Sequence, residues 1–206
     1  TRGNVIIKHG RGVHPDWQDL INPLRVGLID YGWNTLSIQM PVLAKTAKYY
    51  DYIKIFPEAM PRIEAAIRHL REHNPGPIIL LAHSCSTHML QHWLNQRGSA
   101  ATATFDGYIG IGMGATDYQQ PMQAPYALAQ IPTPILDIYA EHDYPAVLRT
   151  APERLRLINQ AGNPRSKQQI IPNAEHEFRE QGEALTSAIA DWLNTLQAAP
   201  TVNKIP

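Results

Sequence analysis

The chain has 206 residues, 44% hydrophobic and 17% charged, which predicts one soluble domain over residues 1–206 with a core of its own. Its 18 basic residues balance its 18 acidic ones, so it lacks the basic excess typical of proteins that bind nucleic acid. The single cysteine, Cys85, excludes an intrachain disulfide and a cysteine-rich zinc module. No apolar run approaches the roughly 20 residues of a membrane span.

Short aliphatic runs alternate along the chain with segments of helical period. The six runs are 5–7, 35–39, 78–82, 105–111, 135–139 and 168–171. The helical stripes run over 17–28, 56–70, 89–94 and 185–196, and Pro23 predicts a late start or a kink in the first of them. This alternation predicts βαβ units, and hence an α/β three-layer sandwich with a mainly parallel six-stranded sheet.

Ligands of such sheets bind beyond the carboxyl ends of the strands, so the residues after each run are the candidates. The third run ends Ala82-His83-Ser84-Cys85-Ser86 and leads directly into a helix, which is the setting of the nucleophile elbow G-x-S-x-G. There Ser84 would present its hydroxyl, and the N–H of Cys85 at the helix start would stabilise an oxyanion. The alternative is that Ser84 only caps the helix.

The first run ends in His9-Gly10-Arg11-Gly12, which is typical of the oxyanion loop of serine hydrolases. The N–H of Arg11 would be the second oxyanion donor. His9, Gly10 and Gly12, together with His83 of the elbow, are the candidate substrate-binding residues. A glycine-rich turn feeding a helix is the plainer alternative.

An acid and a base follow the last two runs. Asp143 comes three residues after the small residue Ala140, and His176 lies in the loop before the last helix. His176 would act as general base toward Ser84, with Asp143 holding its tautomer. Taken singly, Asp143 could be a turn former and His176 a surface residue; together they give the order Ser, Asp, His of the α/β-hydrolases.

From residue 5 to 196 the chain therefore resembles the α/β-hydrolase superfamily. His-Pro-Asp-Trp at 14–17 and Gly-Trp-Asn-Thr-Leu-Ser-Ile-Gln at 32–39 look like a little-characterised bacterial family of small hydrolase-like proteins. The resemblance implies a sheet without the two leading strands of the full fold, all parallel, in the order 2-1-3-4-5-6, and no large lid. Ala82, Ser86 and Ala140 stand where the superfamily favours glycine, which predicts lower efficiency rather than another fold.

The start at Thr1 predicts a trimmed form or a mature form after signal removal. One unpaired cysteine fits either side of a bacterial inner membrane, so cytoplasm and periplasm both stay open.

Three other patterns compete for a functional role. Cys85 is one residue out of register for a nucleophile, so its side chain should point away from the strand tip. His88 and His92 share a helix face, but without a third ligand nearby we expect a solvated or core-edge pair and no metal. The glycines at 110–114 imitate a dinucleotide turn, but no clear helix follows, so we expect a plain loop and no cofactor.

The walls of the site are expected from two segments. Of the aromatic stretch 49–56, one tyrosine should reach the cleft while the others pack on the sheet edge. The segment 113–131, with Tyr118, Pro121, Pro125 and Tyr126, predicts a minimal cap and an open, shallow site.

These features predict a metal-independent serine hydrolase that cleaves an ester or related acyl bond of a small molecule. The same triad serves thioesters and amides, and the Arg11 side chain suggests an acidic or phosphorylated substrate. A binding or scaffold protein that keeps the fold without turnover is the alternative.

Overall fold

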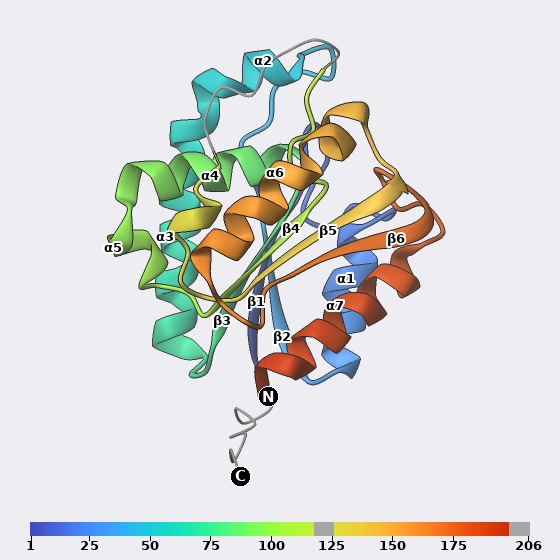
Figure 1. Ribbon diagram of the computed structural model, residues 1–206. Coiled ribbons are helices and arrows are strands. Elements are labelled where there is room, and N and C mark those ends of the chain that lie inside the picture. Colours follow the sequence, from blue (N-terminus) through green and yellow to red (C-terminus); the bar gives the residue numbers. More distant parts are fainter. Residues whose placement is uncertain (118–125, 198–206) are drawn as a thin grey trace.

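The computed structural model describes residues 1–117 and 126–197, and its centre is one six-stranded, all-parallel sheet (Figure 1). The strands follow the order β2-β1-β3-β4-β5-β6, as expected. Their bounds are β1 Gly3–Lys8, β2 Trp33–Ile38, β3 Ile78–His83, β4 Gly107–Ile111, β5 Ile135–His142 and β6 Lys167–Glu175. The predicted α/β sandwich and strand order are therefore confirmed.

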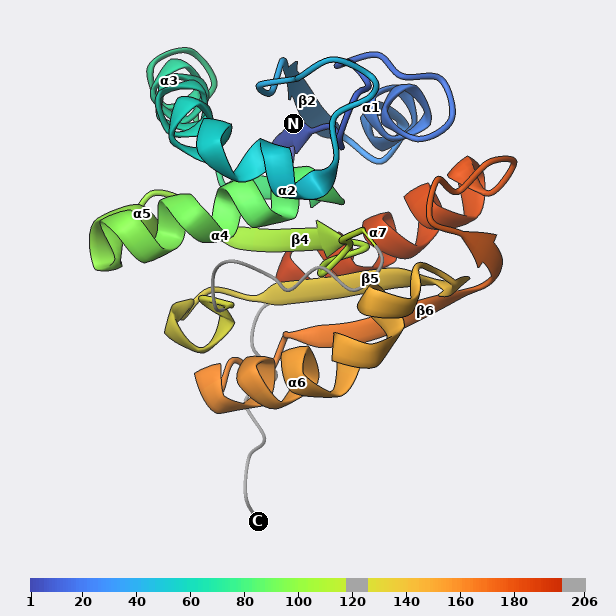
Figure 2. The same ribbon diagram turned by 90° about the horizontal axis from the view of Figure 1, so that it is seen from above.

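Helices cover both faces of the sheet (Figure 2). One face carries α1 (Ile21–Asp30) and α7 (Gly182–Gln197), and the other carries α3 (Phe56–His73), α4 (Cys85–Arg97) and α6 (Pro145–Ala161). The short elements are α2 Tyr49–Tyr52, the 3-10 turn η1 Ile53–Ile55, α5 Ser99–Thr102 and the 3-10 turn η2 Leu128–Gln130.

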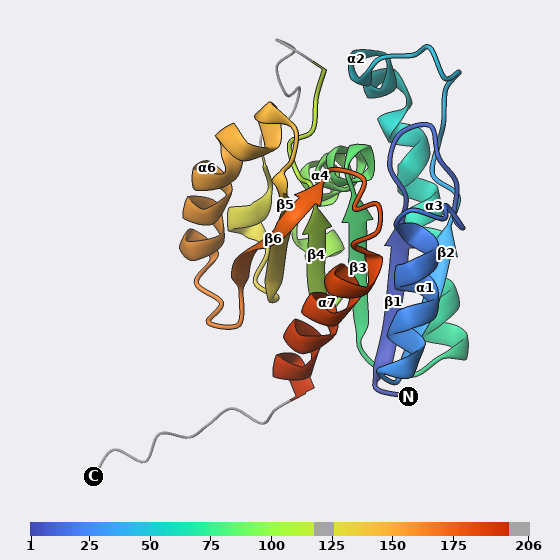
Figure 3. The same cartoon turned by 90° about the vertical axis from the view of Figure 1, so that its right-hand side faces the viewer.

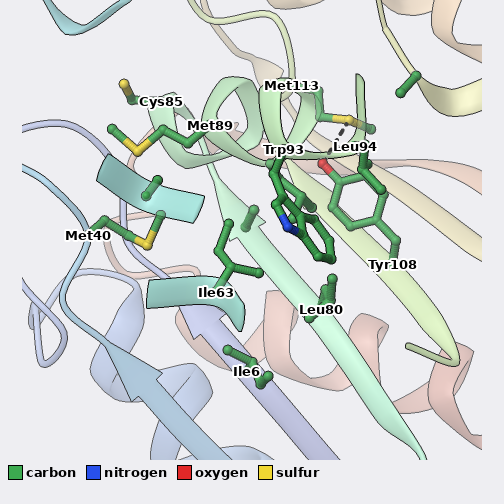
Figure 4. Packing of buried hydrophobic residues seen from close by; sticks show 14 of the residues in the cluster. Ile6, Met40, Ile63, Leu80, Cys85, Met89, Trp93, Leu94, Tyr108 and Met113 are labelled. Carbon is green, nitrogen blue, oxygen red and sulfur yellow. Dashed lines mark hydrogen bonds between the residues drawn. The ribbon is translucent and has the colours of Figure 1, made fainter. Parts of the chain in front are cut away.

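Two separate hydrophobic cores explain why the strands read as continuous apolar runs. Along β1, Val5 and Ile7 pack toward α1 and α7, whereas Ile6 packs toward α3 and α4. A strand buried on both faces needs apolar residues at every position. Figure 4 shows the second of these cores, where Trp93 and Tyr108 are both buried.

The structure refines several expected boundaries. Helix α1 begins late, at Ile21, so Pro23 lies in its first turn, where a missing N–H breaks no helical hydrogen bond. Strands β5 and β6 extend beyond the predicted runs, to His142 and Glu175. Helix α6, which begins with Pro145, was not predicted from the sequence.

The sheet points its carboxyl edge toward α2, which lies above the strand ends (Figure 3). Of the expected cap at 113–131, Tyr118, Pro121 and Pro125 fall outside the described residues. Within residues 1–117 and 126–197, no helix combines the length and apolar character needed to cross a bilayer.

Candidate active site

Four consecutive strands of the sheet are each followed directly by a residue of the candidate site. Ser84 is the first residue after β3, and Gly112 is the first after β4. Asp143 and His176 hold the same position after β5 and β6. Because these strands are parallel neighbours, their ends meet at one edge of the sheet, and the four residues form a row along it.

The three predicted triad residues form one hydrogen-bonded chain. Nε2 of His176 lies 2.8 Å from Oγ of Ser84, and its Nδ1 lies 2.6 Å from Oδ1 of Asp143. All three residues are at most 5% exposed. With Nδ1–H donated to the carboxylate, Nε2 is left as the acceptor for the Ser84 hydroxyl.

The backbone of Ser84 has the conformation of a nucleophile elbow. Its φ of 55° and ψ of −120° lie in a region that residues with a side chain rarely adopt, at a cost of about 1–3 kcal/mol. Its N–H donates to the carbonyl of Ile111 at 2.8 Å, which ties the turn to β4. The hydroxyl of Ser86 donates to the carbonyl of Lys8 at 2.8 Å and accepts the N–H of His83. Ser86 therefore fastens the elbow to β1.

The carboxylate of Asp143 is held on both oxygens. Oδ2 accepts the N–H of Ala140 at 3.1 Å, while Oδ1 accepts the N–H of Tyr144 at 2.8 Å in addition to the imidazole of His176. Three donors fix the orientation of the carboxylate, so it can in turn fix the orientation of the histidine.

Gly112 provides the room that His176 needs to reach Ser84, and this role was not predicted from the sequence. To reach Ser84 from the end of β6, His176 must pass over the ends of β5 and β4. A Cβ on Gly112 would lie 2.8 Å from Cε1 of His176, and the φ of Gly112 is +60°. Both facts require glycine here. The glycines at positions 110, 112 and 114 were the feature of the sequence that could have indicated this role.

Gly10 brings the loop after β1 against the elbow. A Cβ on Gly10 would lie 2.9 Å from Nδ1 of His83 and 3.2 Å from Cβ of Ser84. Nε2 of His83 donates to the carbonyl of His176 at 3.1 Å, while its buried Nδ1 has no partner in the described part of the chain. Burial lowers the pKa of His83 to about 3, so this ring stays neutral beside the triad.

Tyr49, from α2, is the one tyrosine of the stretch 49–56 whose hydroxyl contacts Ser84. The two hydroxyls form a short hydrogen bond inside the site. Burial raises the pKa of Tyr49 above its usual range, which keeps the phenol a neutral donor. The ring of Tyr52 packs in the core, and its hydroxyl accepts the N–H of Leu43.

Tyr144 covers one side of the His176 imidazole. Its ring stacks on His176 with centroids 4.0 Å apart and an angle of 20° between the planes. Its hydroxyl donates to Oε1 of Glu177 at 3.0 Å. The sequence offered one signal for this residue, an aromatic side chain directly after Asp143.

The remaining residues of the predicted oxyanion loop have different surroundings. The ring of His9 is buried, with Nδ1 2.8 Å from the Gly10 carbonyl and Nε2 accepting the N–H of Met40. The His9 ring therefore links Gly10 of this loop to Met40. Gly12 is exposed with φ +71°. The guanidinium of Arg11 lies over the ring of Tyr49, 4.5 Å from its centroid.

Cys85 and His88, which were considered as a nucleophile and a metal ligand, have other surroundings. Cys85 is buried in the core with Met89 (Figure 4), and burial raises the pKa of its thiol to about 12. His88 donates to the carbonyl of Ala115 at 2.7 Å and stacks on Phe56. Across residues 1–117 and 126–197, no three potential metal ligands gather in one place.

The triad opens into a small cavity of about 290 Å³. Ser84, His176, His83 and Gly10 all line it, so two of the four predicted substrate-binding residues face this space. Its other lining residues are Arg11, Val13, Trp17, Asp19, Tyr49, Tyr144, Glu177 and Arg179.

Solved structures of similar fold are α/β hydrolases. A dienelactone hydrolase from Anabaena variabilis shares 20% identity, with a TM-score of 0.68 over 94% of this chain and 86% of that one. Est1E from Butyrivibrio proteoclasticus, bound to ferulic acid, shares 14% identity, with a TM-score of 0.68 over 95% and 90%. An α/β serine hydrolase homologue from Coxiella burnetii shares 16% identity, with a TM-score of 0.65 over 93% and 85%. These likenesses identify the fold as that of the α/β-hydrolase superfamily.

A search of curated protein sequences found no match. A family model described as a protein of unknown function, DUF3530, matches residues 1–54 and 54–195. These two segments together cover most of the chain, and the chain therefore belongs to the DUF3530 family.

Proposed function

We propose that this protein is a serine hydrolase that cleaves a carboxylic ester or a related acyl bond through an acyl-enzyme. The observation that carries the proposal is the hydrogen-bonded chain from Asp143 through His176 to Ser84, together with the left-handed backbone of Ser84. A structural role for these residues would need neither the strained elbow nor a histidine linking a carboxylate to a hydroxyl. The fold, common to esterases and other hydrolases, also supports it.

The proposed reaction has two halves. Oγ of Ser84 attacks the carbonyl carbon while its proton moves to Nε2 of His176, and a tetrahedral oxyanion forms. Collapse of this intermediate breaks the bond to the leaving alcohol, which takes the proton from His176. A water molecule then attacks the acyl group while its proton moves to Nε2 of His176. When this second tetrahedral intermediate collapses, His176 returns the proton to Oγ of Ser84 and the acid is released.

The oxyanion would be held by backbone donors on both sides of Ser84. The N–H of Cys85 is the first of α4, so no earlier turn of the helix supplies it with an acceptor. The N–H of Arg11 follows Gly10, which lies against Ser84. The Tyr49 hydroxyl already contacts Oγ and would donate a further hydrogen bond to it while Oγ gives up its proton and attacks.

The first experiment is labelling with a fluorophosphonate probe, with the adduct located by peptide mass spectrometry. We expect one adduct on Ser84 that is absent from Ser84→Ala. The His176→Ala variant should label at least about 100-fold more slowly, because it lacks the general base. Ser99→Ala, which removes an exposed serine at the start of α5, is the matched control and should label like the wild type.

The same experiment distinguishes a serine hydrolase from the main alternative, a binding protein. A well-folded protein that gives no adduct on Ser84 contradicts the proposed activity and favours a binding protein that keeps the hydrolase fold without turnover. A positive result leads to an ester and thioester series that defines the leaving group.

A further inference from the structure

A second, larger cavity adjoins the one that holds the triad. Its volume is about 490 Å³, and it shares Arg11, Tyr49 and Tyr144 with the smaller cavity. Its other lining residues are Thr116, Asp117, Pro145, Ala146 and Arg149. A substrate whose carbonyl lies at Ser84 can therefore extend into this space.

Two guanidinium groups line the second cavity. Arg11 is held in place, because one of its N–H groups donates to the carbonyl of Ala47 at 2.7 Å and its plane lies over the Tyr49 ring. Arg149, in the first turns of α6, makes no hydrogen bond or ion pair to any other residue in the described ranges. A cation in a cavity wall that has no partner in the described part of the chain is available to a ligand.

One carboxylate also lines the cavity, but it is engaged. Asp117 accepts the N–H of Tyr49 in a short hydrogen bond at the start of α2. Two guanidinium groups and one carboxylate leave a formal charge of +1, which matches a monoanion such as a carboxylate better than a phosphate dianion.

The triad cavity has no net formal charge, because Arg11 and Arg179 balance Asp19 and Glu177 among its lining residues. Glu177 accepts the Tyr144 hydroxyl there, and the Arg179 guanidinium is paired with Asp19 at 3.3 Å. The excess positive charge therefore lies in the second cavity, so an acidic substrate end is attracted toward Arg149.

We propose that the Arg11–Arg149 cavity binds a carboxylate carried by the substrate, so that the enzyme prefers acidic esters over neutral ones of the same size. This inference rests on the proposed hydrolase activity and adds the substrate class. The planar fork of Arg149 can donate two N–H groups to one carboxylate, and the rings of Tyr49 and Tyr144 flank the apolar chain that leads to it.

Two matched pairs of esters test the proposal. In the first pair the charge is on the acyl part: mono-4-nitrophenyl adipate against its neutral methyl ester, 4-nitrophenyl methyl adipate. In the second pair it is on the leaving group: 4-carboxyphenyl hexanoate against 4-(methoxycarbonyl)phenyl hexanoate. The measured quantity is the kcat/KM of the acidic ester divided by that of its neutral partner.

We expect this ratio to fall about tenfold in Arg149→Ala for at least one pair, and Arg149→Lys to retain part of the preference because it keeps the charge. Arg156→Ala removes the same charge two turns further along α6, where Arg156 pairs with Glu153, and should keep the wild-type ratio. Added salt should lower the ratio of the wild type.

The outcomes separate this inference from the proposed function. If neutral and acidic esters are both cleaved with ratios that Arg149→Ala leaves unchanged, the inference is wrong and the hydrolase activity stands. If Arg156→Ala lowers the ratio as much as Arg149→Ala, the preference comes from overall charge and not from this cavity. If no ester is cleaved and Ser84 gives no probe adduct, the proposed function itself fails and the inference with it.

Discussion

The interior and the carboxyl end of β5 each hold a buried carboxylate, and the two carboxylates have different partners. Asp137, in the interior, pairs with the Arg154 guanidinium at 2.8 Å and accepts from Gln168 at 2.7 Å. Asp143, directly after the strand, pairs with His176 at 2.6 Å. The side chains of both aspartates are 0% exposed, so burial alone does not distinguish them.

The two aspartates differ in what their partners, Arg154 and His176, contact beyond the carboxylate. Arg154 is fully buried between α6 and the sheet, and it donates further to the carbonyl of Val147, so this network closes within the core. His176 leads to the hydroxyl of Ser84 and to a cavity. A buried, paired carboxylate therefore indicates a functional site only when its partner faces a space that a ligand can enter.

The largest expected effect comes from Asp143→Asn. An amide cannot accept on both sides, so its NH₂ group must face either the N–H of Ala140 or the donors at Oδ1. The histidine loses its fixed tautomer, and we expect kcat to fall about 10³- to 10⁴-fold. Steady-state hydrolysis of a 4-nitrophenyl ester measures this, with circular dichroism as the check that the variant is folded.

If Asp143→Asn keeps full activity, then Asp143 does not differ from Asp137 in its importance for activity. The matched substitution Asp137→Asn should change the activity per folded molecule little, because Asp137 contacts neither Ser84 nor His176 in the structure.

The core pair should affect stability instead. Arg154→Met leaves Asp137 buried without its cation, and burial already raises the pKa of Asp137 against the opposing effect of Arg154. We expect the free energy of unfolding to fall by about 3–5 kcal/mol. Urea unfolding followed by fluorescence measures it. The double variant Asp137→Leu/Arg154→Met should recover part of the loss, and a double variant as unstable as Arg154→Met would show that packing, not charge, holds this region.

A smaller effect is expected at Lys8, a buried cation on β1. Its ammonium has one long hydrogen bond, 3.4 Å to the carbonyl of Ile6, and burial lowers its pKa to about 7. The unfolded chain keeps this proton up to a pH of about 10.5, so it binds more protons than the folded protein between those values. Stability should therefore rise with pH between about 7 and 10.5.

Lys8→Met should remove that rise and stabilise the protein at neutral pH by about 1–3 kcal/mol. Thermal unfolding of both proteins at pH 7 and pH 9.5 tests this. If Lys8→Met lowers the stability at pH 7, then the ammonium of Lys8 makes a favourable interaction, and the prediction that its burial destabilises the folded protein is wrong.

The sequence predicted the strands and the triad because both depend on local pattern. Apolar runs mark the strands, and Ser84, Asp143 and His176 come within five residues of the end of a run. The strand order that the family resemblance implies was then enough to bring them together. The contact between Tyr49 and Ser84 joins residues 35 apart on different elements, and no local pattern encodes it. The pairing of Asp137 with Arg154 was missed for the same reason.

The hydroxyl of Ser86 has a consequence for recognising further proteins of this kind. It occupies a position where hydrolase motifs usually require glycine, yet here it ties the turn to the neighbouring strand. Ala82 likewise fits at the other flanking position, fully buried. A motif search that demands glycine on both sides of the serine would pass over this chain. A search pattern that accepts any small residue at both positions, and requires an aspartate and a histidine directly after later strands, would retrieve it.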